Sequence, residues 1–251
     1  MKSTIPLGLL DGTTPRILLE SKTSAPIASD GKTDFIMNDS MPTKIARPVV
    51  IGLVGGIASG KSFVGRLLEN LGAQRIDADL LGHEVLILKE VRERLVQIWG
   101  PNILNDQGEV DRAKIGRLVF GNSFNSVAQR KQLEAIVHPR IRSLAFERIS
   151  AIRSWPEVPL AIVLDAPLLI EAGWEPMCDF ILFIDSPREE RIHRATARGW
   201  TESHFADREA SQIPLDEKRS RATHFLDNSQ HATIAQQVNH FWKELERRVP
   251  K

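Results

Sequence analysis

The sequence predicts an α/β fold in which a parallel β-sheet is covered on both faces by helices. From residue 48 onward, short apolar runs that suit buried strands alternate with stretches of helical periodicity. A glycine-rich segment, Gly55–Ser62, directly follows the first apolar run and precedes a helical stretch. Ligands bind to such sheets outside the carboxyl ends of the strands, so we expect the functional site at that edge.

The first predicted strand, residues 49–54, leads into the glycine-rich segment, which fits the phosphate-binding pattern G-x-x-x-x-G-K-[ST]. Glycines allow a tight loop whose amides point inward at phosphate oxygens. The helix that follows adds free N–H groups and the positive end of its dipole. Lys61 would reach the β- and γ-phosphates of a nucleotide, and the Ser62 hydroxyl would hold Mg²⁺.

The residues around this loop favour phosphate binding over a glycine turn that binds nothing. Apolar residues after Ser62 recur with the spacing of one helix face, and Gly72 stands where a glycine would end that helix. Strand, loop and helix therefore occur in the order that the motif requires.

Four further apolar runs predict the other strands of a five-stranded sheet, at residues 73–76, 160–164, 180–184 and 225–226. Each run is followed by an aspartate, in order Asp77, Asp165, Asp185 and Asp227. Polar groups thus collect at the predicted ligand edge. Among them, Asp165 is a candidate second ligand for Mg²⁺.

The helical segment between the second and third predicted strands is longer than a minimal crossover connection requires. About eighty residues between Asp79 and strand 160–164 have helical character, with one helix near 91–99 and another near 133–137, which we expect Pro139 to kink or end. This excess predicts an inserted helical lobe. The periodic stretch 234–245 predicts a final amphipathic helix that serves packing.

A helix start is predicted at Ser186-Pro187-Arg188-Glu189, with Ser186 as the cap. On that helix Arg191, Arg194 and Arg198 would share one face, because they are spaced by three and four residues. The alternative is a solvated basic face. Because a polyphosphate site is predicted independently, we expect at least one of these arginines to bind phosphate.

A phosphate-binding loop does not identify the group that accepts a phosphoryl group. A hydroxyl acceptor needs a carboxylate to orient it and take its proton. Asp77 and Asp79 lie two residues apart at a strand end, so both are expected to face the site, and Asp79 is our candidate base. The alternative is that these aspartates only cap the next helix.

Composition sets the broad class. The 251 residues suit one good-sized domain, alone or with inserted lobes, and 42% apolar and 26% charged residues are ordinary for a globular protein. A net charge of +1 neither indicates nor excludes nucleic acid. The single cysteine, Cys178, excludes an internal disulfide. The apolar runs are too short for a bilayer, so we expect a cytoplasmic protein without a membrane partner.

Residues 1–47 differ from the rest, being rich in Ser, Thr, Pro, Asp and Lys without a sustained period. This composition predicts a disordered tail, with residues 48–251 forming a single domain. Met41 lies shortly before the first strand and is an alternative translation start.

Over most of residues 48–230 the sequence resembles the dephospho-coenzyme A kinase family. The resemblance depends on the order and spacing of several segments: Gly52–Ser62, Ile76–Asp79, Asp111-Arg112 with Leu118–Phe120, Leu133-Glu134 with His138-Pro139, Asp165–Glu171, Arg208 with Ser211-Gln212, Ile213–Leu215, Lys218, and Asp227-Asn228.

The resemblance implies a P-loop kinase that uses ATP and Mg²⁺ to phosphorylate the ribose 3′-hydroxyl of dephospho-CoA, the last step of coenzyme A synthesis. It implies a P-loop core, a helical CoA-binding lobe at about 82–157 and a helical lid at about 187–220. ATP and dephospho-CoA are the implied partners, with no nucleic acid, and we expect a monomer or a weak homo-oligomer.

The resemblance also assigns roles to individual residues. The implied catalytic residues are Asp79, Lys61 and Arg194. The implied ATP-binding residues are Gly55, Gly56, Ile57, Ala58, Ser59, Gly60, Lys61, Ser62, Phe63 and Arg198. Besides Asp79, the implied substrate contacts are Arg112, His138 and Arg140. The implied metal ligands are Ser62 and Asp165.

One residue of the loop departs from the family pattern, and other classes of P-loop protein would require other segments. Ala58 stands where the family often has glycine, which is tolerable if its φ is negative. A shikimate-like kinase would have a triple glycine after the third strand, and a GTPase would have Asn-Lys-x-Asp; neither segment is present. The chemistry alone does not exclude a regulatory NTPase that binds a nucleotide in order to control a partner. Intact Lys61, Ser62 and Asp79 argue against a pseudoenzyme.

Overall fold

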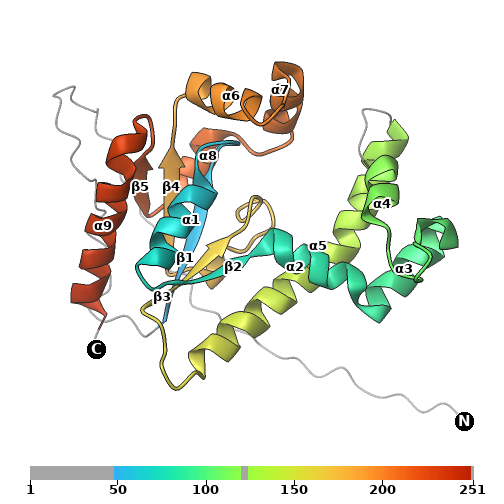
Figure 1. Ribbon diagram of the computed structural model, residues 1–251, viewed down its shortest axis with the longest axis horizontal. Coiled ribbons are helices and arrows are strands. Elements are labelled where there is room, and N and C mark those ends of the chain that lie inside the picture. The colour runs from blue at the N-terminus through green and yellow to red at the C-terminus, as the bar shows by residue number, and fades with distance from the viewer. Residues whose placement is uncertain (1–47, 120–123, 250–251) are drawn as a thin grey trace, which may run out of the picture. The chain divides into compact units, whose positions relative to one another are not determined.

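The computed structural model describes residues 48–119 and 124–249. Its centre is a five-stranded, all-parallel sheet with the order β2-β3-β1-β4-β5 (Figure 1). The strands are β1 (Val49–Gly55), β2 (Gln74–Asp77), β3 (Ala161–Asp165), β4 (Phe180–Asp185) and β5 (His224–Asp227). Every residue of β1 and β3 is buried, as expected for apolar strands covered on both faces. The predicted five-stranded parallel sheet is confirmed.

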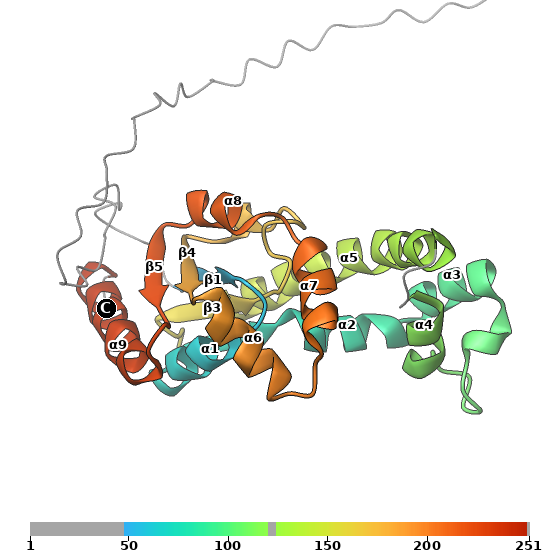
Figure 2. The same ribbon diagram turned by 90° about the horizontal axis from the view of Figure 1, so that it is seen from above.

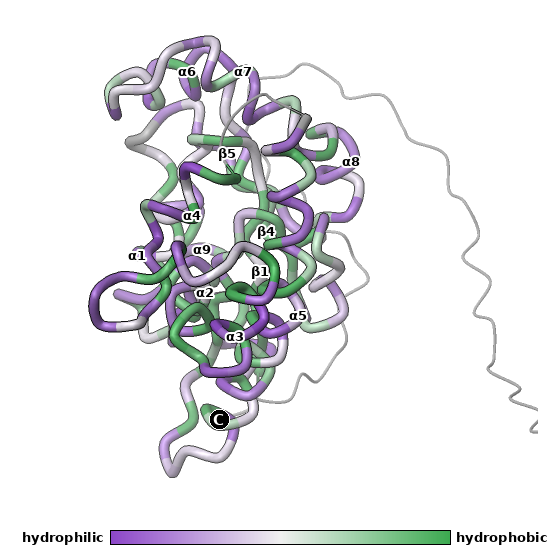
Figure 3. Tube along the Cα trace, turned by 90° about the vertical axis from the view of Figure 1, so that its right-hand side faces the viewer, coloured by the Kyte–Doolittle hydropathy of each residue, from purple (hydrophilic) through white to green (hydrophobic). Residues whose placement is uncertain are grey.

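Helices cover both faces of the sheet. One face packs against α1 (Lys61–Asn70) and α9 (His231–Arg248) through a large apolar cluster that includes Leu68, Val238 and Phe241. Figure 2 shows α5 (Phe124–Arg153) and α8 (Leu215–Ser220) on the opposite side. In Figure 3 the interior strands β1 and β4 are green, whereas much of the outer helical chain is purple.

The long segment between β2 and β3 is helical, as expected. It contains α2 (Ala78–Ile87), α3 (Lys89–Trp99), the 3₁₀ turn η1 (Pro101–Ile103), α4 (Arg112–Val119) and α5. These elements share an apolar cluster apart from the sheet: Val85, Val91, Leu95, Ile103, Ile115, Val119 and Val137. Pro139 lies inside α5, so of the two expected effects, a kink or an end of the helix, it does not produce the end. Side chains on both sides of Pro139 are packed, which outweighs the loss of one backbone hydrogen bond.

The chain after β4 forms α6 (Arg188–Thr196), α7 (Glu202–Ala210) and α8, and the first two lie beyond the carboxyl ends of the strands (Figure 1). A second 3₁₀ turn, η2 (Glu175–Met177), precedes β4. Thr201 caps α7 by accepting a hydrogen bond from the His204 amide.

Two predictions about α6 are wrong. Ser186 does not cap it, because the cap position is Pro187 and the Ser186 hydroxyl accepts instead from Arg194 at 3.0 Å. Arg198 does not share a helical face with the other arginines, because α6 ends at Thr196 and Arg198 lies in the turn that follows.

His224 at the start of β5 is only 1% exposed and lies edge-on to the rings of Phe180 and Phe241, with centroid distances of 5.5 and 5.2 Å. Burial, aided by the positive charge of Arg248, lowers the pKa of His224 to about 4. The folded protein therefore keeps this ring neutral at pH values where the unfolded chain protonates it.

We expect His224 to make the stability depend on pH. As the pH falls from about 6.5 towards 4, the unfolded state binds a proton at His224 and the folded state does not. The free energy of unfolding therefore decreases by about 3 kcal/mol. Urea unfolding at pH 7.5 and 4.5 measures this loss. His224→Leu should shrink the difference between the two pH values by that amount, whereas His193→Gln, at an exposed position in α6, should leave it unchanged. An equal pH dependence in the parent and His224→Leu would contradict the assignment.

No helix within the two described ranges combines the length and apolar character that crossing a membrane requires. The predicted tail, residues 1–47, lies outside the described residues.

Candidate active site

A cavity of about 820 Å³ opens at the carboxyl edge of the sheet. The loop after β1 and the start of α1 form one wall, with residues 57–63 and Arg66. Asp79 of α2 and two residues of α5 line it from the helical segment between β2 and β3. The remaining wall comes from the segment after β3 and from the α6–α8 region: Pro167, Leu168, Arg198, Trp200, His204, Asp207, Arg208, Ser211 and Gln212.

The loop has the backbone that the glycine pattern requires. Gly55 has a φ of 146° and Gly60 a φ of 106°, both in the region that favours glycine. Ala58 has a φ of 58°, so the condition of a negative φ, under which an alanine would be tolerated without strain, is not met. The alanine holds a left-handed turn at a cost of about 1–2 kcal/mol relative to glycine. Gly60 begins α1 without a capping side chain, which leaves first-turn amides to bind an anion.

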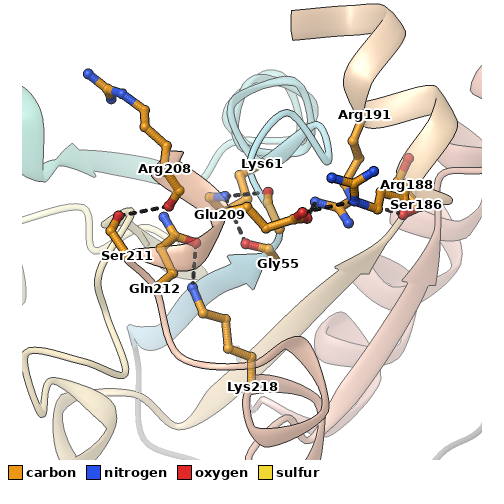
Figure 4. Close-up of polar contacts among 11 residues, drawn as sticks. Gly55, Lys61, Ser186, Arg188, Arg191, Arg208, Glu209, Ser211, Gln212 and Lys218 are labelled. Atoms are coloured by element: carbon orange, nitrogen blue, oxygen red, sulfur yellow. Dashed lines mark hydrogen bonds and ion pairs between the residues drawn. The ribbon is translucent and has the colours of Figure 1, made fainter. Parts of the chain in front are cut away.

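The Lys61 ammonium lies within the loop. Its Nζ donates to the carbonyls of Gly55 and Gly56, each at 3.1 Å (Figure 4). Burial and then the nearby charge of Lys218 lower the pKa of Lys61 to about 8, although Asp165 and Glu171 act in the opposite direction. A phosphate that binds next to such a buried ammonium strongly stabilises its charged form.

Asp77, the last residue of β2, and Asp79, just after it, have different roles. Asp77 caps α2, since its Oδ1 accepts from the amides of Asp79 at 2.9 Å and Leu80 at 3.3 Å, and it pairs with Arg75. Asp79 lies in the first turn of α2 and lines the cavity. The strand-alternation argument is therefore wrong, because the chain is already helical at Ala78. Burial and then the charge of Asp77 raise the pKa of Asp79, while His83 and Lys61 oppose this.

Asp165, at the end of β3, is 6% exposed and lies 3.5 Å from the Nε of Arg75. Burial raises its pKa, and the charge of Arg75 opposes that rise. The Ser62 hydroxyl belongs to an exposed residue at the start of α1 and lines the cavity.

The three arginines predicted to share one helix face lie in different surroundings. Arg194 donates to the Ser59 carbonyl at 3.3 Å and to the Asn228 carbonyl at 2.9 Å, and it lines a second cavity of about 450 Å³ next to the first. Arg198 is exposed and lines both cavities. Arg191 is 3% exposed and lines neither.

The structure does not bring the other three expected substrate contacts to these cavities. Arg112 is exposed at the start of α4, and His138 is partly buried in α5. Arg140 lies between Glu90 and Glu147, at 3.4 and 3.6 Å.

Two residues of α5, Arg130 and Glu134, line the main cavity. The sequence analysis proposed neither as a site residue, although Glu134 belongs to a segment on which the family resemblance depends. They stand four residues apart on one helix face, a spacing that is visible in the sequence. Trp200, His204 and Arg66 were also missed. The Trp200 and His204 rings lie tilted by 33° with centroids 4.7 Å apart, and the Arg208 guanidinium lies 4.9 Å from the Trp200 centroid.

Comparison with known proteins agrees with this geometry. The profile of the dephospho-CoA kinase family matches residues 49–233. A dephospho-CoA kinase from Geobacter sulfurreducens is 41% identical over 202 residues, which are 80% of this chain and 94% of that protein.

Two solved structures are also similar. The crystal structure of TT1252 from Thermus thermophilus has a TM-score of 0.63 and 34% identity, covering 79% of this chain and 98% of that one. Dephospho-CoA kinase from Campylobacter jejuni has a TM-score of 0.60 and 26% identity, covering 79% and 97%. The chain therefore belongs to the dephospho-CoA kinase family, whose members are ATP-dependent kinases that convert dephospho-CoA to coenzyme A.

Proposed function

We propose that this protein transfers the γ-phosphoryl group of ATP to the ribose 3′-hydroxyl of dephospho-CoA. The observation that carries the proposal is that one cavity is lined both by Lys61, at the end of the phosphate loop, and by Asp79, in helix α2. One group suits a triphosphate and the other a hydroxyl, so both substrates of a phosphoryl transfer can meet there.

In this proposal the loop amides and the start of α1 bind the phosphates of ATP. Lys61 leaves the loop carbonyls and binds the β- and γ-phosphate oxygens, where it stabilises the charge of the transition state. Arg198, exposed towards both cavities, adds a guanidinium to the same phosphates. Arg194 fixes the loop through the Ser59 carbonyl and is available to the nucleotide from the second cavity.

Asp79 orients the acceptor. Its carboxylate accepts the hydrogen bond of the 3′-hydroxyl and takes its proton as the O3′–P bond forms and the bond from Pγ to the β,γ-bridging oxygen breaks, releasing ADP. Its raised pKa makes it a better proton acceptor than an ordinary aspartate. Arg130 and Glu134 contact the acceptor from α5, while Arg112, His138 and Arg140 are candidates for its distal groups.

The residues near the loop fit Mg²⁺ bound together with ATP. The ion takes oxygen ligands, usually one or two from protein with the rest from phosphates and water. The exposed Ser62 hydroxyl and the buried Asp165 carboxylate supply such oxygens. In the described residues no cluster of three or more acidic, His or Cys side chains forms a metal cage, which matches an ion held largely by the nucleotide. When bound, Mg²⁺ neutralises charge on the β- and γ-phosphates.

The two helical additions have separate tasks in this proposal. The lobe at about 82–157, built on α3, α4 and the first half of α5, binds the CoA moiety. The lid at about 187–220, built on α6–α8, closes over ATP and excludes water.

An acceptor panel tests the proposed function. ADP release would be measured with dephospho-CoA, shikimate, a nucleoside and no acceptor. We expect dephospho-CoA alone to raise the rate by roughly a hundredfold or more over the rate without acceptor. A nucleotide switch would release ADP at the same slow rate in all four reactions, and that outcome would reject the kinase.

A further inference from the structure

The buried guanidinium of Arg191 supports the phosphate loop from behind. A Cβ on Gly56 would lie 2.7 Å from one of its terminal nitrogens and 3.0 Å from Cζ, so the guanidinium packs directly on that glycine. Its Nε donates to the Ser186 carbonyl at 3.2 Å. Because Arg191 reaches neither cavity, it acts on the loop and not on a ligand.

The partner of this guanidinium is Glu209 in the last turn of α7. One carboxylate oxygen of Glu209 accepts from Arg191 at 2.7 Å, and the other accepts from the Nε of Arg188 at 2.9 Å (Figure 4). Phe205, 1% exposed and one turn earlier, lies under both guanidinium groups, at 5.6 and 5.5 Å. Burial opposes ionisation of Glu209, but these hydrogen bonds outweigh it, and the pKa of Glu209 is lowered.

The same helix forms part of the cavity wall. His204, Asp207 and Arg208 of α7 line the main cavity, while Glu209 faces the other way, towards α6. One short chain of contacts thus runs from the cavity wall through Glu209 and Arg191 to Gly56, whose carbonyl accepts from Lys61.

We propose that Glu209 is a positioning residue for ATP: through Arg191 it holds the phosphate loop in shape and fixes α7 over the cavity. This inference rests on the proposed use of ATP. Without Glu209, Arg191 has no carboxylate partner at this site, and either the guanidinium or α7 must move. The loop and the lid then lose their alignment together.

The test compares Glu209→Leu and Glu209→Gln with two controls. Arg188→Gln removes only the exposed half of the contact, and Glu202→Gln removes an exposed charge from the same helix. ATP affinity by titration, KM and kcat with dephospho-CoA, ATP hydrolysis without acceptor, and melting temperature would be measured. We expect Glu209→Leu to weaken ATP binding roughly tenfold or more and to raise the share of hydrolysis, with Glu209→Gln intermediate. Both controls should stay within about twofold of the parent.

A double variant separates positioning from simple charge compensation. Arg191→Met with Glu209→Leu removes both partners of a buried ion pair, so the melting temperature should recover relative to Glu209→Leu. ATP affinity should stay low, because nothing then supports Gly56. Recovery of affinity along with stability would overturn the proposal, as would single Glu209 variants that bind ATP within about twofold of the parent. If the parent bound ATP but phosphorylated no acceptor, the proposed function would fail while the affinity comparison still decided the role of Glu209.

Discussion

Lys61→Ala is expected to lower kcat by roughly a hundred- to a thousandfold, or about 3–4 kcal/mol of transition-state stabilisation. The ammonium lies 3.1 Å from two loop carbonyls at the end of β1, the position from which it would reach the transferring phosphate. Steady-state kinetics with ATP and dephospho-CoA measure the loss. Melting temperature serves as the control for folding, and turnover within about tenfold of the parent would reject the P-loop assignment.

The same lysine predicts how ATP use depends on pH. With a pKa of about 8, Lys61 loses its charge in the free enzyme as the pH rises through that value. Since kcat/KM reports groups of the free enzyme, kcat/KM for ATP should fall above pH 8. In Lys61→Arg the charge persists, and this basic limb should disappear.

Asp79→Asn is expected to lower kcat by roughly a hundredfold or more while ATP affinity is retained. Asparagine keeps the size of the side chain but cannot take the proton of the acceptor hydroxyl. Turnover and ATP titration on the same preparation separate the two effects. Lost ATP affinity with an unchanged rate per bound ATP would show that Asp79 serves the nucleotide instead.

Asp77→Asn is the matched control. It retains an oxygen that can cap α2, so its loss of turnover should be much smaller than that of Asp79→Asn. Because the base must be ionised and its pKa is raised in the free enzyme, kcat/KM for dephospho-CoA should fall on the acid side at a pH above the ordinary aspartate range, and this limb should be absent in Asp79→Asn.

The sheet and its loop could be predicted because their signals are local. A buried parallel strand is an apolar run, and a phosphate loop has its glycines, lysine and serine within eight residues, Gly55–Ser62. The ligand edge then follows from strand direction alone. Lys61, Ser62 and Asp79 could therefore be placed at one cavity without any tertiary information.

Two of the differences between prediction and structure depended on other parts of the chain. Ser186 resembles a helix cap, but Arg194 and the carbonyl of Asn228, 42 residues away, bind its hydroxyl. Pro139 resembles a helix end, but packing on either side carries α5 past it. Arg130 was not proposed as a site residue, because its place at the cavity depends on how α5 lies relative to the phosphate loop.

Helix α5 belongs to two apolar clusters at once. Its early turns place Val137 among α3 and α4, and its later turns place Ala145 and Ile149 against the sheet. Ile141 and Leu144 touch both clusters. If the lobes of two relatives were exchanged with the junction inside α5, side chains of one parent would have to pack against a cluster of the other. One of the two apolar clusters would then be poorly packed. The unit that could be exchanged between relatives is therefore the whole stretch from β2 to β3. This unit is larger than the part of the chain that contains the substrate contacts.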